Sequence, residues 1–388
     1  MSTDLRSRAW VEINGSALHR NMARVAGLVG GGGRVLPVVK SNAYGLGLGP
    51  VLRVLERSDP WGYGVAEVRE AEAIRTHGVT RPVLILNPLP PGDVHVAVAG
   101  AFELSVSSMG EVDRIVGALD GSDRSVRLHA EVDTGMGRAG FDWREVGRWG
   151  PDLIARTSDR VEWTGLFTHF HSASDPDADA VTVQSERFAA AARALSGMRA
   201  GKWVEHLCNS SALFRSSRLA GDLVRPGIFL YGGRIGSDLP APESIVSLRA
   251  RIVLVREVPP GTTLGYGATY RATRPERWAT VAIGYGDGLP RCLGNRGQAV
   301  VAGRRVRIVG RISMGLTVVD ITDLPEADVR IGDEATFLGR SGTESISVDE
   351  VAGLAGTISY EILTGLSARL PRLWSSADEP DAPDTGIQ

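Results

Sequence analysis

Short apolar runs alternate with longer amphipathic stretches along the chain as far as about residue 232. The apolar runs are rich in β-branched residues and predict strands at 34–39, 62–66, 83–86, 103–107, 126–132, 163–169, 203–207 and 223–228. Hydrophobic residues at helical spacing predict helices at 16–29, 67–77, 109–119, 178–195 and 211–219. We expect Ser16 to cap the first helix and Gly78 to end the second.

Eight strand–helix units in series favour parallel strands, and eight parallel strands close a barrel. We therefore predict an α/β fold with an N-terminal (β/α)8 TIM-type barrel over residues 14–240. A doubly wound open sheet is the alternative, but no G-x-G-x-x-G follows the first strand.

The pattern changes after Pro240, where strands are predicted with little helix between them. They lie at 246–258, 280–283, 299–301, 306–309, 316–321 and 334–338, before a predicted helix at 348–354. This indicates a mostly β C-terminal domain over residues 241–374. The polar, proline-containing end, 375–388, is predicted to be disordered.

Composition excludes several classes of protein. The 43 basic and 45 acidic residues give a net charge of -2, which provides no argument for nucleic acid or an anionic membrane. Two cysteines, Cys208 and Cys292, imply no disulfide framework. Without an apolar leader or a membrane-length apolar run, we expect a cytoplasmic protein.

Polar residues follow several of the predicted barrel strands. They are Lys40, Tyr44, Glu131, Arg138, His169, His206 and Arg225. Taken alone, a lysine after a strand is more often simply solvated. In a barrel, however, the carboxyl ends of all strands meet on one face, where chemistry is carried out. The combination therefore predicts an active site there.

A lysine at a strand end can be a nucleophile or base if burial lowers its pKa. Asn209-Ser210 and Gly227-Ile228 follow the last two strands, where barrels often bind phosphate. Together these features suggest pyridoxal phosphate. A zinc site at His169 and His171 is less favoured because no HExxH motif accompanies it, and no G-x-S-x-G indicates a hydrolase.

Motifs over residues 8–372 resemble those of the alanine racemase family, in the family's order. They are VVKSNAYGLG, EVDTGMGRAGF, GLFTHF, HLCNSSALF, VRPGIFLYG, GYGATY, AIGYGDGLPR, GRISM and TISYEILTGLSARLPR. The resemblance implies a barrel-type pyridoxal phosphate enzyme that interconverts L- and D-alanine, or a similar small amino acid, and supplies a peptidoglycan precursor. It also implies a homodimer with shared active sites, and an N-terminal strand within residues 1–13 that joins the β domain.

The resemblance also assigns roles to residues. Lys40 resembles the Schiff-base lysine and one of two catalytic bases, and Tyr266 resembles the second base, supplied by the other subunit. Arg225 resembles the donor to the pyridine nitrogen, with His169 supporting Tyr266 and His206 beside the ring. The phosphate-site positions are Tyr44, Asn209, Ser210, Gly227, Ile228 and Tyr360. Arg138 and the Met314 N–H match the substrate carboxylate site, and the approach to the site matches Tyr285, Arg291 and Arg311.

Three positions depart from the family pattern. Glu131 stands where many members have a carbamylated lysine, and we expect it to supply that negative charge directly and to pair with Arg138 across the strand-end turn. Gly315 and Leu316 replace an aspartate and usually a glutamine, so a larger or less polar substrate is an alternative. Leu46 replaces a histidine. A pyridoxal phosphate-dependent lyase or aldolase on the same fold, or a non-enzymatic carrier of the cofactor, is also compatible with a lysine and a phosphate site at the strand ends.

Overall fold

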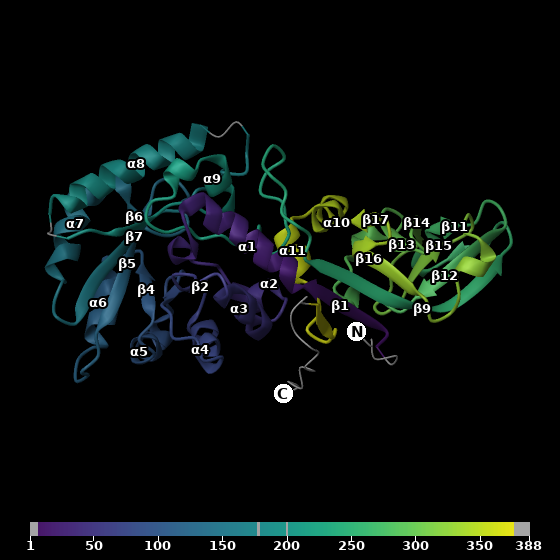
Figure 1. Cartoon of the computed structure of the whole chain (residues 1–388), viewed down its shortest axis with the longest axis horizontal. Helices are drawn as coiled ribbons and strands as arrows, with labels where there is room; N and C mark the ends of the chain where they lie inside the picture. Colours follow the sequence, from purple (N-terminus) through teal and green to yellow (C-terminus); the bar gives the residue numbers. More distant parts are fainter. Residues whose placement is uncertain (1–6, 177–178, 199–200, 376–388) are drawn as a thin grey trace. The chain divides into compact units, whose positions relative to one another are not determined.

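The computed structural model describes residues 7–176, 179–198 and 201–375, which form two compact units (Figure 1). One unit comprises His19–Leu230 and Arg234–Pro242. The other comprises Tyr231–Gly233 and the described residues of Met1–Leu18 and Glu243–Gln388. The first residue of the predicted helix 178–195, residues 1–6 and the predicted disordered end from residue 376 onward lie outside the described residues.

The first unit is the predicted barrel, built on a parallel ladder of strands. In spatial order these are β2 (Tyr63–Val65), β3 (Val83–Ile85), β4 (Glu103–Val106), β5 (Val126–Asp133), β7 (Val161–Phe167) and β8 (Val204–His206), with β6 (Phe141–Asp142) beside β5. Isolated parallel bridges, Val35 to Val224, Val38 to Gly64 and Asn209 to Arg225, close the circle.

The predicted strands 34–39 and 223–228 are therefore single bridges rather than regular strands. Each segment contains a proline, Pro37 or Pro226, which has no N–H to donate to a ladder. The neighbouring bonds survive: Leu36 N donates to Val224 O at 2.8 Å and Val39 N to Gly64 O at 2.8 Å. Each proline removes one backbone hydrogen bond but does not change the direction of its segment, so both segments still lie beside their neighbours and the barrel closes.

Helices alternate with these strands. They are α1 (Gly15–Val29), α3 (Leu48–Glu56), α4 (Val68–Thr76), α5 (Val94–Ala99), α6 (Met109–Gly117), α7 (Val146–Ala155), α8 (Asp179–Ser196) and α9 (Ser210–Arg215). The prediction that Ser16 caps α1 is wrong, because Asn14 Oδ1 accepts the bond from Ala17 N at 2.9 Å. The predicted stop at Gly78 is confirmed: it follows α4 with φ +78°.

The second unit is mostly β, as predicted. Its nine-stranded sheet has the order β17-β16-β13-β14-β15-β12-β9-β1-β18, and β16 also pairs with β9. The strands are β1 (Ala9–Asn14), β9 (Val246–Val258), β12 (Glu276–Val281), β13 (Gln298–Val301), β14 (Arg304–Val309), β15 (Thr317–Asp320), β16 (Glu334–Ser341), β17 (Glu344–Ile346) and β18 (Arg372–Ser375). A small hairpin, β10 (Thr263–Leu264) and β11 (Tyr270–Arg271), and helices α10 (Val348–Ala355) and α11 (Ser359–Thr364) complete it.

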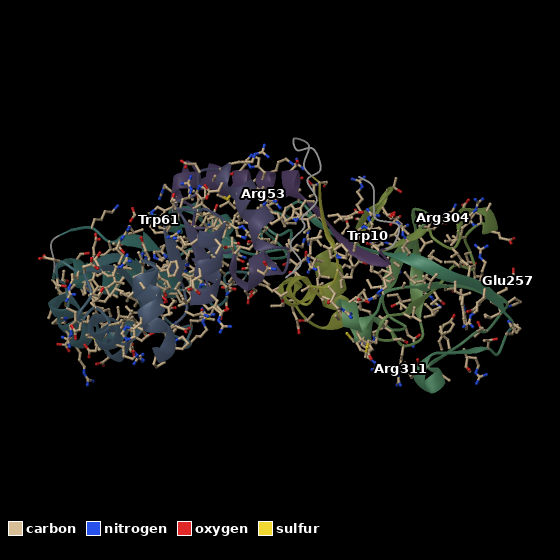
Figure 2. All side chains as sticks on the ribbon, turned by 90° about the horizontal axis from the view of Figure 1, so that it is seen from below. Trp10, Arg53, Trp61, Glu257, Arg304 and Arg311 are labelled. Carbon is tan, nitrogen blue, oxygen red and sulfur yellow. The ribbon has the colours of Figure 1, made fainter. Side chains whose placement is uncertain are left out.

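The N-terminal strand β1 lies inside this sheet, antiparallel to β9 and parallel to β18. Figure 2 shows Trp10 on β1, where its ring is covered by the Arg251 guanidinium at 5.1 Å. Trp10 is fully buried, so β1 contributes to the core of a unit whose other strands lie more than two hundred residues further along the chain.

Candidate active site

Lys40 begins α2 (Lys40–Tyr44), a turn that winds in the left-handed sense. Ser41, Asn42, Ala43 and Tyr44 have φ of 56°, 53°, 52° and 57°. For residues other than glycine this conformation costs about 1–2 kcal/mol each. Neighbouring polar groups hold it: the Glu70 carboxylate accepts from Ser41 N and, at 2.8 Å, from Ala66 N, and Asn42 Oδ1 accepts from Leu48 N at 2.8 Å.

The left-handed turn buries Tyr44 against the last barrel segment. A Cβ added to Gly227 would lie 2.3 Å from the Tyr44 hydroxyl oxygen, so a side chain at that position would displace the phenol. Ser210 Oγ accepts a bond from Gly227 N at 2.9 Å, which leaves the hydroxyl hydrogen free to donate elsewhere. Three segments thus bring a phenol, a hydroxyl and bare backbone together.

Asn209 and Ile228 are close to this cluster in sequence. The Asn209 side-chain oxygen caps α9 by accepting from Ala212 N at 3.0 Å, so this amide oxygen already has a hydrogen-bond partner within the protein. Ile228 is buried beside Gly227.

Lys40 is one of only two lysines in the chain. Burial lowers its pKa, the positive charge of Arg138 lowers it further, and Glu70 partly opposes both effects. The other lysine, Lys202, is exposed and donates to Asp222 at 2.6 Å, a bond that raises its pKa. Of the two amines, Lys40 is the one made more nucleophilic by its surroundings.

Glu131 lies on β5 with 4% of its surface exposed. Burial raises its pKa, and the charges of Arg225 and Arg138 partly offset that rise. Ser107 Oγ donates to its carboxylate at 3.3 Å. The predicted pair with Arg138 is not formed in the part of the chain that the structure describes, and the Arg138 charge acts on the Glu131 carboxylate through space rather than by direct contact.

Arg138 projects from the loop after β5, which the preceding Asp133 shapes. The Asp133 carboxylate accepts from Gly135 N at 2.9 Å and from Gly137 N at 3.1 Å. Gly135 and Gly137 have φ of +145° and +69°, which other residues rarely adopt. The glycines therefore allow the loop to fold back and present an exposed arginine near the strand ends.

Arg225 is the most buried cation of the site, with 4% exposed. Its guanidinium donates to Thr168 O at 2.7 Å and to His206 Nδ1 at 2.8 Å, and covers the Phe167 ring at 5.1 Å. Burial lowers its pKa to about 10, so it stays protonated at neutral pH. Among the described residues, no acceptor takes its Nε–H.

The two predicted histidines are both neutral in this cluster. Burial, followed by the charges of Arg225 and Arg138, lowers the pKa of His169 to about 3. Burial and Arg225 also hold the pKa of His206 well below its usual value. Lys40, Arg138 and Arg225 therefore supply positive charge that Glu131 only partly balances, an arrangement suited to an anionic ligand.

The remaining predicted residues belong to the β unit and are exposed: Tyr266, Tyr285, Arg291, Arg311, Met314 and Tyr360. The loops that carry four of them approach one another. A Cβ on Gly267, next to Tyr266, would lie 2.9 Å from the Arg311 guanidinium, and Tyr285 N donates to Ser313 O at 3.1 Å beside Met314. Arg291 is in a separate short turn, and Tyr360 is on α11.

Three participants were not predicted: Glu70, Glu103 and His129. His129 could have been predicted from the sequence. It lies two residues before Glu131 in a predicted strand, and alternate residues of a strand point to the same face. Glu70 lies in the first turn of α4, where an acidic side chain often accepts from backbone N–H groups.

The described residues contain neither a cluster of metal ligands nor a helix suited to a membrane. Across residues 7–176, 179–198 and 201–375, no three His, Cys, Asp or Glu side chains gather as a metal site would require. None of the described helices has the length and apolar character to cross a membrane.

The family profiles for the alanine racemase N-terminal domain and C-terminal domain match residues 13–235 and 245–374. An alanine racemase of Symbiobacterium thermophilum is 36% identical over 96% of this chain and 99% of its own length. The alanine racemase of Bacillus anthracis, solved with bound L-Ala-P, has a TM-score of 0.88 at 32% identity and covers 96% of each chain. That of Bartonella henselae, solved with covalently bound pyridoxal phosphate, has a TM-score of 0.86 at 27% identity over 95% of this chain and 100% of its own.

The residues of the barrel fit that cofactor. Lys40 offers an amine of lowered pKa for the aldehyde, and Arg225 offers an Nε–H that bonds to none of the described residues. Gly227 leaves the backbone bare beside the hydroxyls of Tyr44 and Ser210, as a phosphate cradle requires. Together with the matches over nearly the whole chain, this places the protein in the alanine racemase family, which consists of pyridoxal phosphate-dependent isomerases.

Proposed function

We propose that this chain interconverts L- and D-alanine, or a similar small amino acid, by moving the α-proton between two faces of the substrate. The observation that carries the proposal is the strand-end cluster in which Lys40, with a lowered pKa, lies among the charges of Arg138, Arg225 and Glu131. Bound pyridoxal phosphate supplies the electron sink that makes the α-proton acidic. The product would serve as a D-amino acid precursor of peptidoglycan, made in the cytoplasm.

Racemisation needs a proton-carrying group on each face of the α-carbon. Lys40 Nζ would hold the cofactor and, once the substrate has displaced it, carry the proton on one face. Tyr266 Oη would carry the proton on the other face. A tyrosine does this only if its phenolate is stabilised, and we assign that support to His169 and Arg225.

Arg225 controls which reaction follows. Because arginine does not give up its proton at working pH, its Nε–H can donate a hydrogen bond to the pyridine nitrogen without protonating it. An unprotonated ring would draw less negative charge from the α-carbon, and Arg225 would thereby favour return of the proton over transamination. His206 would support Arg225 beside the ring.

The ends of cofactor and substrate would be fixed by separate groups. We assign the cofactor phosphate to Tyr44, Asn209, Ser210, Gly227, Ile228 and Tyr360. The substrate carboxylate would be held by Arg138 and the Met314 N–H, with Glu131 bracing Arg138 through space. Tyr285, Arg291 and Arg311 would line the approach, where two cations attract the carboxylate of an amino acid.

The linkage to Lys40 can be tested on the purified enzyme. The holoenzyme is reduced with borohydride, digested and mapped by mass spectrometry, and L- and D-alanine are assayed for α-proton exchange in deuterium oxide. We expect the cofactor mass on the peptide of Lys40, none on Lys202, and exchange of both enantiomers. Cofactor on Lys202, or racemisation of neither alanine nor another small amino acid, would overturn the proposal.

We further propose that Lys40 and Tyr266 of one site come from two subunits of a homodimer. Inactive Lys40→Ala and Tyr266→Phe proteins are mixed in equal amounts, unfolded and refolded together. If each site takes its two groups from different subunits, a hybrid dimer has one intact site, and about a quarter of wild-type activity returns. If both groups come from one subunit, every hybrid site is defective and no activity returns.

A wider substrate range is a second candidate, favoured by Gly315. A Cβ at this position would meet only the Arg8 guanidinium, at 4.0 Å, so the structure has room for a side chain that the sequence does not supply. Gly315→Asp is expected to fold normally and to lower activity on amino acids larger than alanine relative to alanine. An unchanged ratio of kcat/KM values would remove this candidate.

A further inference from the structure

A row of four hydrogen-bonded side chains crosses the inside of the barrel behind the candidate site. Arg225 NH1 is 2.8 Å from His206 Nδ1, His206 Nε2 is 2.8 Å from His129 Nδ1, and His129 Nε2 is 2.7 Å from Glu103 Oε2. The row connects β8, β5 and β4, and only its first two members were expected in the site.

The barrel is built to allow this row. Strand β7 lies between β5 and β8, and its Gly165 is paired with His129. A Cβ at Gly165 would lie 1.9 Å from His129 Nδ1, so any side chain there would occupy the place of the bond between the two histidines. The missing side chain on the intervening strand is what lets His129 and His206 meet across it.

The two ends of the row impose the same direction on every bond, because the Arg225 guanidinium only donates and the Glu103 carboxylate only accepts. A guanidinium only donates, so His206 Nδ1 must be an acceptor without hydrogen. The neutral imidazole then carries its hydrogen on Nε2 and donates to His129 Nδ1. His129 in turn carries its hydrogen on Nε2 and donates to Glu103. Both histidines are thus neutral Nε2–H tautomers, and the row ends on a carboxylate.

The surroundings make another tautomer costly. His129 and His206 are fully buried and Glu103 is 3% exposed. The Phe167 ring stacks on His206 at 4.8 Å and 11°, and Trp61, labelled in Figure 2, meets His129 edge-on at 6.3 Å. With water kept away by these rings, a histidine with its hydrogen on Nδ1 would place two donors face to face without compensation.

We propose that Glu103 and His129 are positioning residues: they fix the tautomer of His206, and His206 thereby holds Arg225 with its Nε–H free for the ligand. The carboxylate at the end of the row defines the direction of the whole chain of donors. Arg127 donates to the other oxygen of Glu103 at 3.0 Å and anchors it from the surface. The tautomers follow from contacts within the chain, and only the link to the cofactor rests on the proposed function.

The first test reads the tautomers in the cofactor-free protein. Side-chain 15N spectra distinguish Nδ1–H, Nε2–H and doubly protonated imidazole, and His129→Phe and His206→Phe identify the signals among the seven histidines. We expect both His129 and His206 to show Nε2–H signals, and His206 to keep this tautomer from about pH 6 to about pH 8. An Nδ1–H or doubly protonated His206 in this range would overturn the proposal.

The second test separates positioning from packing with a conservative pair. In Glu103→Gln the amide oxygen can still accept from His129, whereas Glu103→Leu has no acceptor. We expect Glu103→Leu to lose the single tautomer at His206 and to weaken pyridoxal phosphate binding by roughly tenfold, with Glu103→Gln close to wild type in both. Glu205→Gln, beside His206 but outside the row, is the matched control and should change neither.

Equal effects of Glu103→Leu and Glu103→Gln, or an unchanged His206 tautomer in Glu103→Leu, would overturn the positioning role. If Glu103→Leu fails to fold, His129→Phe provides the same test. It removes His129 Nδ1, the acceptor for His206 Nε2–H, while keeping a ring in place, and the single tautomer at His206 should again be lost. Failure of the proposed function is distinguishable: the enzyme would then lack α-proton exchange while the wild-type histidines still showed Nε2–H signals.

Discussion

The residues assigned to catalysis fall into two groups with opposite surroundings. In the barrel unit, Glu131 and Arg225 are each 4% exposed, and burial together with neighbouring charges shifts the pKa of each. In the β unit, Tyr266 is 68% exposed and Met314 64% exposed. The residues proposed to hold the cofactor are thus buried and interact with one another, whereas the residues proposed for the other half of the site are exposed.

The difference in burial indicates how the side chains of each group are held in place. Buried groups must satisfy one another within the chain, so the barrel side chains are held by named hydrogen bonds. Exposed aromatic and apolar side chains in one unit are typical of a surface that a partner covers. This agrees with the proposal that a second subunit completes each site, and it predicts different consequences for mutations in the two units.

The largest effect is expected from the barrel unit. Lys40→Ala should lower racemisation by about 10^3-fold or more and abolish covalent retention of the cofactor, because Lys202, the other lysine, has a raised pKa. Activity and cofactor retained after gel filtration are measured together. Lys202→Ala is the control. Near-wild-type activity in Lys40→Ala would contradict the proposal that the buried barrel residues hold the cofactor and carry the proton.

A large but different effect is expected from the exposed unit. Tyr266→Phe should lower kcat by about 10^2–10^3-fold while leaving cofactor affinity unchanged, since it removes a proton carrier and no buried contact. In deuterium oxide, α-proton exchange should persist for one enantiomer through Lys40 and be lost for the other. Equal loss of exchange for both enantiomers would show that Tyr266 does not serve one face alone.

A smaller effect is expected at Glu131. Glu131→Gln removes the charge near Arg138 and should raise KM for the amino acid by about tenfold with less change in kcat. Glu162→Gln, an exposed carboxylate on β7, is the matched control. Because Glu131 needs no carbon dioxide to carry its charge, bicarbonate should leave wild-type activity unchanged. An unaltered KM in Glu131→Gln would show that the carboxylate braces nothing.

The smallest effect concerns stability and pH. The pKa of His169 is about 3 in the folded chain and 6.5 ordinarily, so below about pH 6.5 the unfolded chain binds a proton that the folded chain does not. Stability should therefore fall as pH decreases from 6.5 towards 3, and His206 acts in the same direction. Glu131, with a raised pKa, acts oppositely, because its contribution is lost as pH rises through its folded pKa.

The measurement is the melting temperature of cofactor-free protein between about pH 7 and about pH 5. We expect it to decrease towards pH 5, and to decrease less in His169→Asn. An equal slope in the variant would mean that His169 takes up no proton on unfolding.

The position of much of the candidate site could be predicted because its residues follow strands in the sequence. Lys40, Glu131, His169, His206 and Arg225 each follow or end a run that the hydrophobic pattern already identified, and a barrel gathers all such positions on one face. The errors were local as well: Asn14 rather than Ser16 caps α1, and prolines reduce two predicted strands to bridges.

The left-handed turn after Lys40 was not predictable from its own residues. Ser41 to Tyr44 contain no glycine, and their local preferences favour other conformations. The conformation depends on Glu70, which comes from α4 and accepts from Ser41 N.

The sequence by itself determined the order of strands and helices, the change to a β unit after Pro240, and which side chains stand at strand ends. Periodicity and turn residues encode these features along the chain. Only the tertiary structure decided which of these side chains touch: it separated Glu131 from Arg138, and it joined His129 to His206 across 77 residues through the space left by Gly165. Such contacts depend on the closed barrel, because they join strands that are not neighbours in the sheet.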